Sequence, residues 1–426
     1  MNAKAGRFCG KGADLMLGRN FWATLLFCFL GMGCSSASDE RNRSTGGAKT
    51  VRTTAGVTVH LGPREVLLAD NALGLRYFPD EAIALLDRGP PMRLLVSAGD
   101  SSYLVEGRDL ENLEHASRIL TPGPAGAFDN GYAGTAGAYR DPSGKLYTFY
   151  HAEDHNEELP RQAWYYSGWY GSMGVAVSLD AGRSFRKLGP ALRSAKPDLD
   201  ALAGESTWGV AAPSVVVDRT GTYLFAYYTE HSPGSENRGV TIGMARSDIS
   251  TGEPVPGRWQ KYYDGNFGEP GLGGRDTAIL EIEPRDEAAY LQPHVVFSAE
   301  IDRYVMIVNV AWWRETWGNA DLSRSGIYLA FSEDGIAWST PEPLLIEHSL
   351  PAFGRSLAWQ ATVIWDEASS TEGWLVYAYS ESWGPGYFLG TPHYMVGRRI
   401  GFKRTVPQNE IGLAGLGMRR RGSICS

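Results

Sequence analysis

Short apolar strands separated by polar turns are the dominant pattern along this chain. The apolar stretches are rich in Val, Tyr, Phe and Trp and are bounded by Gly, Pro, Asp and Ser, whereas helical periodicity is hard to find. One phrase, a turn followed by an aromatic-rich strand, occurs four times, at residues 144–153, 221–230, 302–312 and 373–381. This pattern is typical of an all-β fold that is built from repeats.

The four copies are regularly spaced. Tyr147 and Tyr223 are 76 residues apart, Tyr223 and Tyr304 are 81 apart, and Tyr304 and Trp374 are 70 apart. A weaker copy at residues 92–98 precedes the first by roughly one period. Five units of about 75 residues would fill nearly all of the chain beyond residue 60. We therefore predict a five-bladed β-propeller over residues 59–410, a fold in which equivalent loops of every blade meet at one axial pocket.

Two further elements support the repeat. Each predicted blade opens with a strand of small or apolar residues, which suits a crowded innermost position; these strands are 134–141, 209–218, 292–298 and 357–366. Residues 178–185 fit the Asp-box pattern Ser-x-Asp-x-Gly-x-Ser/Thr-aromatic, residues 332–338 are a shortened version, and Ser247-Asp248 is a vestige. In such a turn the Asp accepts backbone amide hydrogen bonds and the Gly takes the strained dihedral, so we predict a structural role for it.

The start of the chain predicts export. Lys4, Arg7, Lys11 and Arg19 give a positive leader. Residues 21–32 form an uncharged apolar run. This run is about a dozen residues long, shorter than the roughly 20 that a spanning helix needs.

The apolar run ends at Cys34, in a context that resembles a bacterial lipoprotein processing box. We predict a signal peptide at residues 1–33, lipidation of Cys34, a flexible polar tether at 34–58 and a tail at 411–426. The protein would then be a cell-envelope lipoprotein, periplasmic or anchored at the outer membrane. Simple secretion and a retained anchor are the alternatives.

The amino-acid composition limits the kinds of partner that this protein is expected to bind. Of the 4 cysteines, Cys9, Cys28 and Cys34 lie in the leader or at its processing point and Cys425 lies near the end, so the predicted propeller has no disulfide and no thiol cluster. A net charge of −8 argues against nucleic acid or an anionic membrane surface as the partner. We expect membrane contact only through the lipid anchor, and we expect a monomer. With 43% hydrophobic residues, a chain of this length can bury a sizeable core.

Blade geometry predicts where polar residues gather. An antiparallel blade starts its inner strand and ends its second strand on the same face, so polar side chains at these two places should share one pocket. The candidates before or on inner strands are Asp129, Glu205, Asp276 and His294; those at the ends of second strands are His151, Glu153, Glu230, Trp312 and Glu381, with Trp208 and Trp359 beside them.

Such a set of carboxylates ringed by aromatic residues suits the cleavage of a glycosidic bond. One carboxylic acid protonates the leaving oxygen, and a second carboxylate activates water or attacks the sugar. Crowding of like charges raises the pKa of one member, so that it can act as an acid near neutral pH. Aromatic faces pack on the C–H surfaces of sugars.

The turns at Asp180 and Asp334, the sequence Ala212-Pro213-Ser214 and the stretch 332–338 resemble the five-bladed β-propeller glycoside hydrolases, the superfamily of arabinanases, β-xylosidases, levansucrases and invertases. The resemblance covers about residues 60–405. It implies that a base, a pKa-setting Asp and an acid Glu come from inner strands of successive blades. It also implies that an axial calcium is compatible with the fold, but this sequence predicts no metal and no cofactor.

Carried onto this chain, the resemblance matches Asp129 to an inner-strand Asp and Glu205 to the acid. Asp70 and Asp80 are the candidates for the base, but neither stands in a motif, so its identity stays open. The predicted catalytic residues are Asp129, Glu205, Glu153 and Asp276, and the predicted substrate-binding residues are His151, Trp208, His294, Arg275, Trp312, Trp359 and Glu381.

Each candidate has an alternative interpretation. Asp129 could cap a turn beside Asn130-Gly131, and His294 could be a core histidine. His151 and Glu153 could tie down a loop or, with His155, bind a metal.

Two other functions compete with the glycosidase. A sialidase would need Arg140, Arg275 and Arg355 around a carboxylate, a Tyr nucleophile and usually six blades. A non-catalytic propeller that binds carbohydrate is the third hypothesis, because a fold does not determine a function. Two carboxylates roughly 5–10 Å apart in the axial pocket would favour the glycosidase.

Overall fold

The structure, a computed structural model, describes residues 47–155, 168–195, 207–232, 240–281, 288–312, 324–346, 355–383 and 392–405. The chain divides into two units, Met1–Arg43 and Ser44–Ser426, and all described residues belong to the second. The predicted signal peptide, the lipidation of Cys34 and the tail at 411–426 lie outside the described residues and stay predictions. Within the described part of the chain, no helix combines the length and apolarity that crossing a membrane would take.

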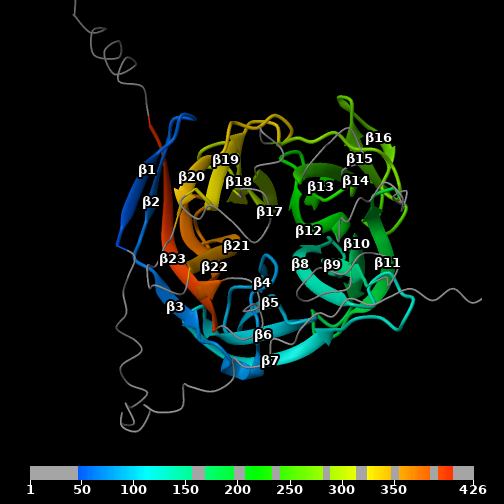
Figure 1. Ribbon diagram of the computed structural model, residues 1–426, viewed down its shortest axis with the longest axis horizontal. Helices are drawn as coiled ribbons and strands as arrows, with labels where there is room; N and C mark the ends of the chain where they lie inside the picture. The colour runs from blue at the N-terminus through cyan, green and yellow to red at the C-terminus, as the bar shows by residue number, and fades with distance from the viewer. Residues whose placement is uncertain are drawn as a thin grey trace, which may run out of the picture. The chain divides into compact units, whose positions relative to one another are not determined.

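The described unit is built almost entirely from strands (Figure 1), with one short 3₁₀ turn, η2 (Ala72–Gly74). The strands are β1 (Lys49–Arg52), β2 (Val57–Leu61), β3 (Glu65–Leu68), β4 (Ala84–Asp87), β5 (Met92–Ala98), β6 (Ser101–Asp109), β7 (Asn112–Leu120), β8 (Tyr132–Arg140), β9 (Leu146–Asp154), β10 (Trp169–Ser178), β11 (Arg186–Arg193), β12 (Thr207–Val217), β13 (Tyr223–Glu230), β14 (Thr241–Asp248), β15 (Trp259–Tyr263), β16 (Asn266–Pro270), β17 (Ala288–Ser298), β18 (Arg303–Trp312), β19 (Gly326–Ser332), β20 (Glu342–Leu345), β21 (Arg355–Trp365), β22 (Glu372–Trp383) and β23 (His393–Arg404). The all-β prediction is therefore confirmed.

The strands form four sheets around a common centre. One sheet has the order β4-β5-β6-β7 and another β17-β18-β19-β20. A nine-stranded sheet joins two antiparallel runs, β8 to β11 and β12 to β16, through a short parallel pairing of β10 with β12. The six-stranded sheet contains β21, β22 and β23 together with β1, β2 and β3. Strands β4, β8, β12, β17 and β21 lie nearest the centre (Figure 1), and the number of blades stays a prediction.

The repeated aromatic phrase is the second strand of its antiparallel run. It forms β9, β13, β18 and β22, and the weaker copy forms β5. On β9 and β13 one tyrosine covers a glycine on the third strand. Tyr150 lies opposite Gly174 and Tyr228 opposite Gly243. A Cβ at either glycine would lie 2.2 or 2.5 Å from a ring atom, so the glycine makes room for the ring.

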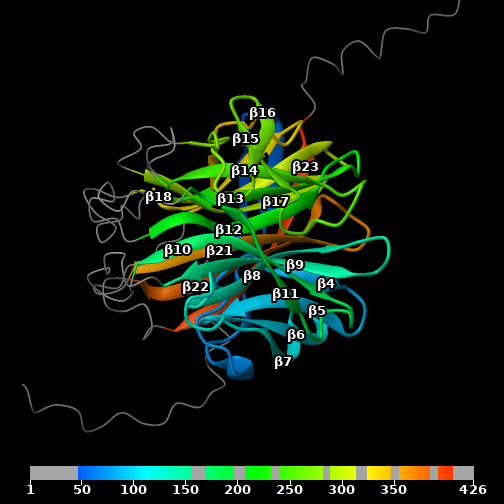
Figure 2. The same ribbon diagram turned by 90° about the vertical axis from the view of Figure 1, so that its right-hand side faces the viewer.

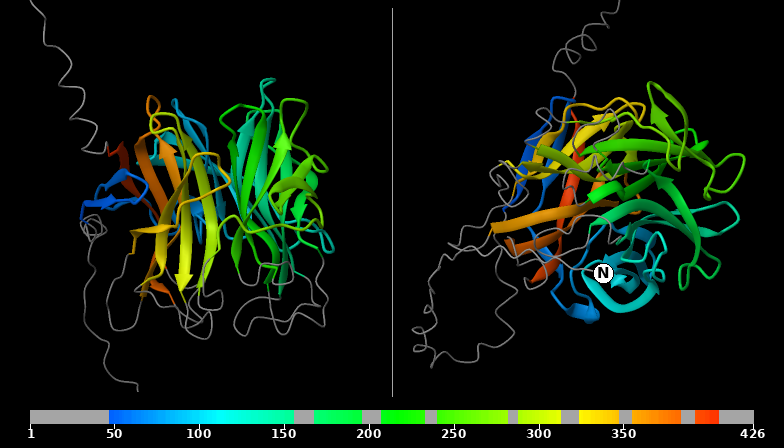
Figure 3. Two further views of the ribbon diagram at one scale, coloured as in Figure 1. Left: turned by 90° about the horizontal axis from the view of Figure 1, so that it is seen from above. Right: turned by 45° about the vertical axis from the view of Figure 1, so that its right-hand side comes forward.

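Hydrogen bonds from one inner strand to the next fix the strands at the centre. Ser214 Oγ on β12 accepts a hydrogen bond from the Val295 amide on β17 at 3.0 Å. Thr362 Oγ1 on β21 accepts one from the Ile83 amide, just before β4, at 2.8 Å. Both hydroxyls are nearly fully buried. Figures 2 and 3 show the strands of the unit from the side and from above.

Bulges in the inner strands turn these side chains toward their neighbours. The register shifts at Ala212 on β12, at Gln292 on β17 and at Gln360 on β21. These residues have φ values of 44°, 54° and 54°, in the left-handed region. A bulge adds one residue to the strand and so re-aims the side chains that follow.

The tight turns predicted at Asp180 and Asp334 have aspartates that bind backbone amides. Asp180 Oδ1 accepts hydrogen bonds from the Ser184 amide at 2.9 Å and from Ser178 Oγ at 2.7 Å. Hydrogen bonds from Ser184 and then Ser178 lower the pKa of Asp180. Asp334 Oδ1 accepts from two amides in the same way. The Asp180 turn follows Ser178, which pairs with the start of β9, far along that strand from Glu153.

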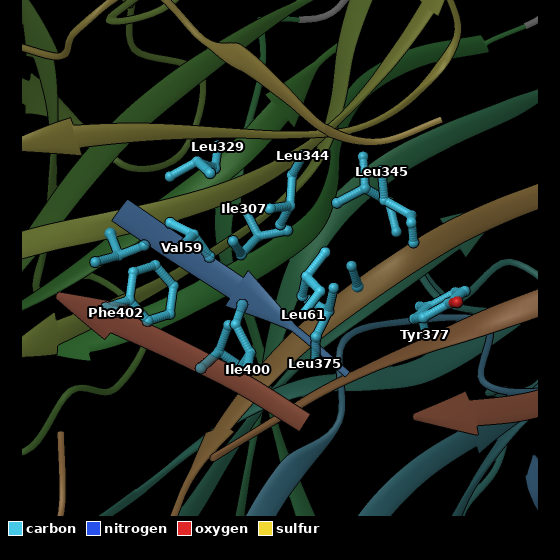
Figure 4. Packing of buried hydrophobic residues seen from close by; sticks show 14 of the residues in the cluster. Val59, Leu61, Ile307, Leu329, Leu344, Leu345, Leu375, Tyr377, Ile400 and Phe402 are labelled. Carbon is cyan, nitrogen blue, oxygen red and sulfur yellow. The ribbon is translucent and has the colours of Figure 1, made fainter. Parts of the chain in front are cut away.

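The two ends of the described unit pair with each other. Strand β2 pairs with β23 from Val57 opposite Arg404 to Leu61 opposite Ile400, and β1 pairs with β2. Val59 and Leu61 are buried among apolar residues of β18, β19, β20, β22 and β23 (Figure 4). The chain therefore uses its N-terminal strands to complete its C-terminal sheet.

This pairing corrects the predicted tether at 34–58. Residues 49–52 form β1, and residues 57–58 already belong to β2. The polar composition is misleading here because β1 is an edge strand with most side chains exposed. Its backbone is held by β2, and its Val51 packs against the apolar core.

Val59→Asp should strongly destabilise the fold, because Val59 is 0% exposed and the carboxylate of the introduced aspartate would have no partner in the core. We expect a loss of about 3 kcal/mol or more in the free energy of unfolding, measured by denaturant titration. His60→Asp, at the neighbouring exposed position, should cost less than about 1 kcal/mol. Equal losses for the two variants would contradict the pairing of β2 into the C-terminal sheet.

Candidate functional site

Inner strands begin where second strands end. Tyr132 at the start of β8 pairs with Glu153 near the end of β9, and Ala288 at the start of β17 pairs with Trp312 at the end of β18. The segment before β4 reaches the same place as Tyr132. The Asp80 carbonyl accepts hydrogen bonds from Gln360 Nε2 at 2.7 Å and from the Tyr132 hydroxyl at 3.5 Å. Elements from three sheets thus meet at Asp80.

Three carboxyl groups and an imidazole form a cluster at this meeting point, which we call the acid cluster: Asp80, Glu81, His151 and Glu153. Glu81 Oε1 lies 2.8 Å from His151 Nδ1, and His151 Nε2 lies 3.8 Å from Glu153 Oε1. On its far side Glu153 Oε2 contacts His155 Nε2 at 2.6 Å. Glu81 and His151 are buried, whereas Asp80 and Glu153 are partly exposed. The partly exposed side chain of Glu153 can therefore reach a ligand, whereas the carboxyl group of Asp80 is buried.

Crowding and burial shift the pKa values of Asp80, Glu81 and His151. Burial, and then the charges of Glu81 and Glu153, raise the pKa of Asp80 well above its usual value. Burial also raises the pKa of Glu81, although the hydrogen bond from His151 opposes this. Burial alone would lower the pKa of His151, but the hydrogen bond and charge of Glu81, with the charge of Glu153, raise it. The cluster thus favours a protonated Asp80 beside a cationic His151.

Aromatic rings surround the imidazole of His151. The Tyr132 ring lies 5.3 Å from it, and the Trp169 ring lies 5.4 Å away in an edge-on contact. Trp169, at the start of β10, also contacts His231 at 5.3 Å. Burial, and then the charge of His151, lower the pKa of His231 to about 3, so this second imidazole is neutral. The acid cluster therefore has an aromatic wall whose Trp169 is partly exposed.

Asp129 lies in a different environment from the one we predicted. Its carboxylate accepts hydrogen bonds from Lys187 Nζ at 2.5 Å and from the Tyr150 hydroxyl at 3.0 Å, and the residue is 2% exposed. Side chains alternate along a strand, so Tyr150 and His151 face opposite sides of β9. Asp129 binds on the Tyr150 side, away from His151. The structure thus favours a structural role for Asp129 over the catalytic role that we predicted.

Asp276 is paired in the same manner. It accepts hydrogen bonds from Lys261 Nζ at 3.0 Å and from the Tyr228 hydroxyl at 3.1 Å. Lys261 Nζ also lies 3.9 Å from Glu230 Oε2, and Ser194 Oγ donates to Glu230 at 2.6 Å. All of these side chains are buried. Asp129 and Asp276 thus each bind a lysine, whereas Glu153 contacts His151 and His155, and the convergence of these acids on one pocket stays a prediction.

The other candidates lie in varied surroundings, and among the described contacts none joins them directly to the acid cluster. Trp208 Nε1 donates to the Ala195 carbonyl at 3.1 Å, and the Trp312 ring is covered by Arg324 at 3.4 Å. Arg275 is exposed and pairs with Glu269 at 2.8 Å. Arg275 is thus a surface residue paired with Glu269, and its part in substrate binding stays a prediction.

His294 Nε2 lies 3.3 Å from the Val363 carbonyl, and burial lowers its pKa to about 4. Trp359 contacts the ring of His393 at 5.4 Å and precedes Gln360, which binds Asp80. Glu205 lies outside the described residues. Glu381 lies in β22, but its side chain is outside the described part.

Sequence reasoning missed part of the acid cluster. It named His151 and Glu153 correctly as neighbours and left Asp80 as an open candidate, but it did not name Glu81 or Tyr132. The available signal was the acidic pair Asp80-Glu81 directly before the first inner strand. Among the residues that the structure describes, no group of three or more His, Cys, Asp or Glu side chains is placed to hold a metal ion.

Comparison with known proteins gives distant structural similarities only. No family model matches the chain. No curated protein matches it either. An α-L-arabinofuranosidase from Lactobacillus brevis is 12% identical, with a TM-score of 0.46 over 83% of this chain and 90% of that chain. An endo-arabinase from Bacteroides thetaiotaomicron is 14% identical, with a TM-score of 0.44 over 75% and 93% of the two chains.

A third similar structure has a different reaction in its name. An N-acetylgalactosamine deacetylase from F. plautii, in complex with a blood group B trisaccharide, is 10% identical, with a TM-score of 0.46 over 76% of this chain and 90% of that chain. Identities and TM-scores this low do not give this chain a family or a reaction.

The second carboxylate cluster should make stability depend on pH. Burial, and then the charge of Asp276, raise the pKa of Glu230 from 4.5 to about 7. A raised folded-state pKa means that this contribution to stability is full below pH 4.5 and is lost as the pH rises through about 7. The Tm of the wild type should therefore fall across this window relative to that of Glu230→Gln, measured by thermal melts.

The exposed Glu114→Gln variant is the matched control, and its Tm should follow that of the wild type at every pH. Parallel Tm curves for the wild type and Glu230→Gln would show that Glu230 does not titrate in this window.

Proposed function

We propose that this protein is a glycoside hydrolase that cleaves a poly- or oligosaccharide. The observation that carries the proposal is the acid cluster, in which the buried carboxyl of Asp80 and the partly exposed Glu153 lie beside a buried Glu81–His151 pair. Glycoside cleavage requires two carboxyl groups in different protonation states on either side of one bond. Asp80, whose pKa burial raises, and Glu153, which contacts two histidines, lie in different surroundings.

The raised pKa of Asp80 suits it to be the general acid. In this role its proton goes to the leaving glycosidic oxygen as the bond from the anomeric carbon to that oxygen breaks. Glu153 accepts a proton from water, whose oxygen forms the new bond to the anomeric carbon. Glu81 is bound to His151 and buried, so it takes no direct part.

The architecture that we propose is a five-bladed β-propeller. Its blades are the antiparallel runs that begin with β4, β8, β12, β17 and β21, and β2 completes the last of them. The placing of these first strands at the centre of the unit supports this count (Figure 1). Export with a lipid on Cys34, or secretion, and a monomeric state complete the proposal and rest on the sequence.

A sialidase is less well supported. Such an enzyme would gather three arginines around a carboxylate of the substrate, and we named Arg140, Arg275 and Arg355 for this purpose. Arg140 is exposed at the end of β8 opposite to Tyr132, and Arg275 is bound to Glu269. The side chain of Arg355 is outside the described part.

Asp80→Asn and Glu153→Gln should each lower kcat/KM for glycan hydrolysis by about 10²- to 10⁴-fold, the usual contribution of one general acid or base. The wild type is first screened against aryl glycosides and plant, microbial and cell-wall polysaccharides by release of reducing sugar. Glycan binding by the variants, measured by calorimetry, should persist because both substitutions keep the shape of the side chain.

Glu114→Gln, at an exposed position of β7, is the matched control and should retain full activity. Full activity in both Asp80→Asn and Glu153→Gln would refute the assigned roles. Binding of a glycan without turnover by the wild type would instead establish the non-catalytic carbohydrate-binding alternative.

A further inference from the structure

His151 occupies an unusual position for a histidine. It lies in the middle of the site on β9, is 6% exposed, and is placed between two glutamates that belong to different parts of the chain. Its Nδ1 contacts Glu81, while its Nε2 points toward Glu153 at 3.8 Å and has no hydrogen-bond partner among the described residues. One imidazole thus connects a buried carboxylate with a partly exposed one.

The neutral and cationic forms of this imidazole differ in the number of hydrogen-bond donors that they present to the two glutamates. A neutral ring with its proton on Nδ1 would donate to Glu81 and direct a lone pair at Glu153, which repels a carboxylate. A cationic ring donates from both nitrogens and attracts both glutamates. The 2.8 Å contact with Glu81 fits a proton on Nδ1, and the carboxyl groups on both sides of the ring favour the cation.

The titratable groups around His151 agree with this assignment. Glu81 comes from the segment before β4, Glu153 from β9 itself and Tyr132 from β8, while Trp169 on β10 closes the remaining side without a charge. In the next layer Asp80 lies beside Glu81 and Glu153, His155 binds Glu153, and His231 packs on Trp169. Acidic groups outnumber cations here, and they act together to raise the pKa of His151.

We propose that His151 is a positioning residue whose imidazolium, held by Glu81, orients Glu153 for its part in catalysis. This inference rests on the proposed function only for the role of Glu153; the charge state of His151 is a property of the folded protein. His151 itself touches no reacting atom in this scheme. It acts through Glu153, as Glu81 acts through His151.

The charge state can be measured without any substrate. In ¹⁵N-histidine-labelled full-length protein, two-bond ¹H–¹⁵N correlation spectra distinguish imidazolium from either neutral tautomer. The chain has 8 histidines, and the His151 signal is the one missing in His151→Gln. We expect an imidazolium pattern with a titration midpoint above 6.5, the ordinary value. In Glu81→Gln this midpoint should fall by about one unit or more, because the neighbouring charge is gone.

The exposed His115 provides the internal reference, since its signal should titrate identically in the wild type and in Glu81→Gln. A neutral His151 at pH 6 would overturn the inference, and so would a midpoint that Glu81→Gln leaves unchanged. If His151→Gln does not fold, the signal is assigned instead as the one that Glu81→Gln displaces most.

Kinetics test the consequence for catalysis. His151→Gln should lower kcat by about 10- to 100-fold with little change in KM, a range that corresponds to usual coupling between contacting groups. The variant should also lose the pH dependence of kcat that the wild type shows around the midpoint of His151, because the titrating imidazole is gone. His115→Gln should leave both unchanged. A loss of kcat by the same factor at every pH would show a purely structural role and refute the proposal.

The two experiments separate this inference from the proposed function. An imidazolium at His151 in a protein that hydrolyses no glycan would reject the hydrolase and retain the charged pair. Hydrolysis that depends on Asp80 and Glu153, with a neutral His151, would reject only the inference.

Discussion

The pairing of β2 with β23 is the constraint on which the rest of this structure depends. It places residues from the beginning of the described chain inside a sheet made from its end, with Val59 and Leu61 in that sheet's core. The chain that follows β2 must then run past β21 before it enters β4. On this path the Ile83 amide donates a hydrogen bond to Thr362 Oγ1, and the Asp80 carbonyl accepts one from Gln360 Nε2. Asp80 and Glu81 therefore owe their position to the closure of the fold.

Buried charge is handled in two distinct ways in this molecule. Asp129 has a lysine and a tyrosine hydroxyl as partners, so its negative charge is compensated within a contact, whereas Asp276 shares Lys261 with Glu230. The acid cluster has three carboxyls and one buried imidazole, which leaves an excess of acid. A fully compensated pair is stable and unreactive, whereas an uncompensated cluster must share a proton. The balance of acids and cations, rather than the number of acids, thus separates the Asp129 pair from the acid cluster and from the Glu230–Asp276 pair.

The same alternation of side chains that builds the sheets also separates these environments. On β9, Tyr150 turns to Asp129 and Lys187, while His151 turns to Glu81 and Trp169. Adjacent residues of one strand thus belong to different networks, one that holds strands together and one that faces the site. Their adjacency in the sequence does not reveal that they belong to different networks.

Much of the fold was predictable because strand formation is a local property. The repeated aromatic phrase gave β9, β13, β18 and β22, since its aromatic and apolar residues favour strands and its turns are specified by Gly and Asp. The same pattern predicted His151 and Glu153 as neighbours, because they stand two residues apart on one strand. It failed at β1, where polar residues form an edge strand that only its partner β2 holds in place.

What the sequence by itself determined is the all-β character, the positions of the second strands and the part of the acid cluster that lies on one of them. Only the tertiary structure decided which acids are bound by lysines. It also brought Asp80 and Glu81 to His151, although Glu81 stands 70 residues before His151 in the sequence. The physical reason is that the reactivity of a carboxyl group depends on its burial and on charges within a few ångströms. Those neighbours come from other sheets, and no local pattern encodes them.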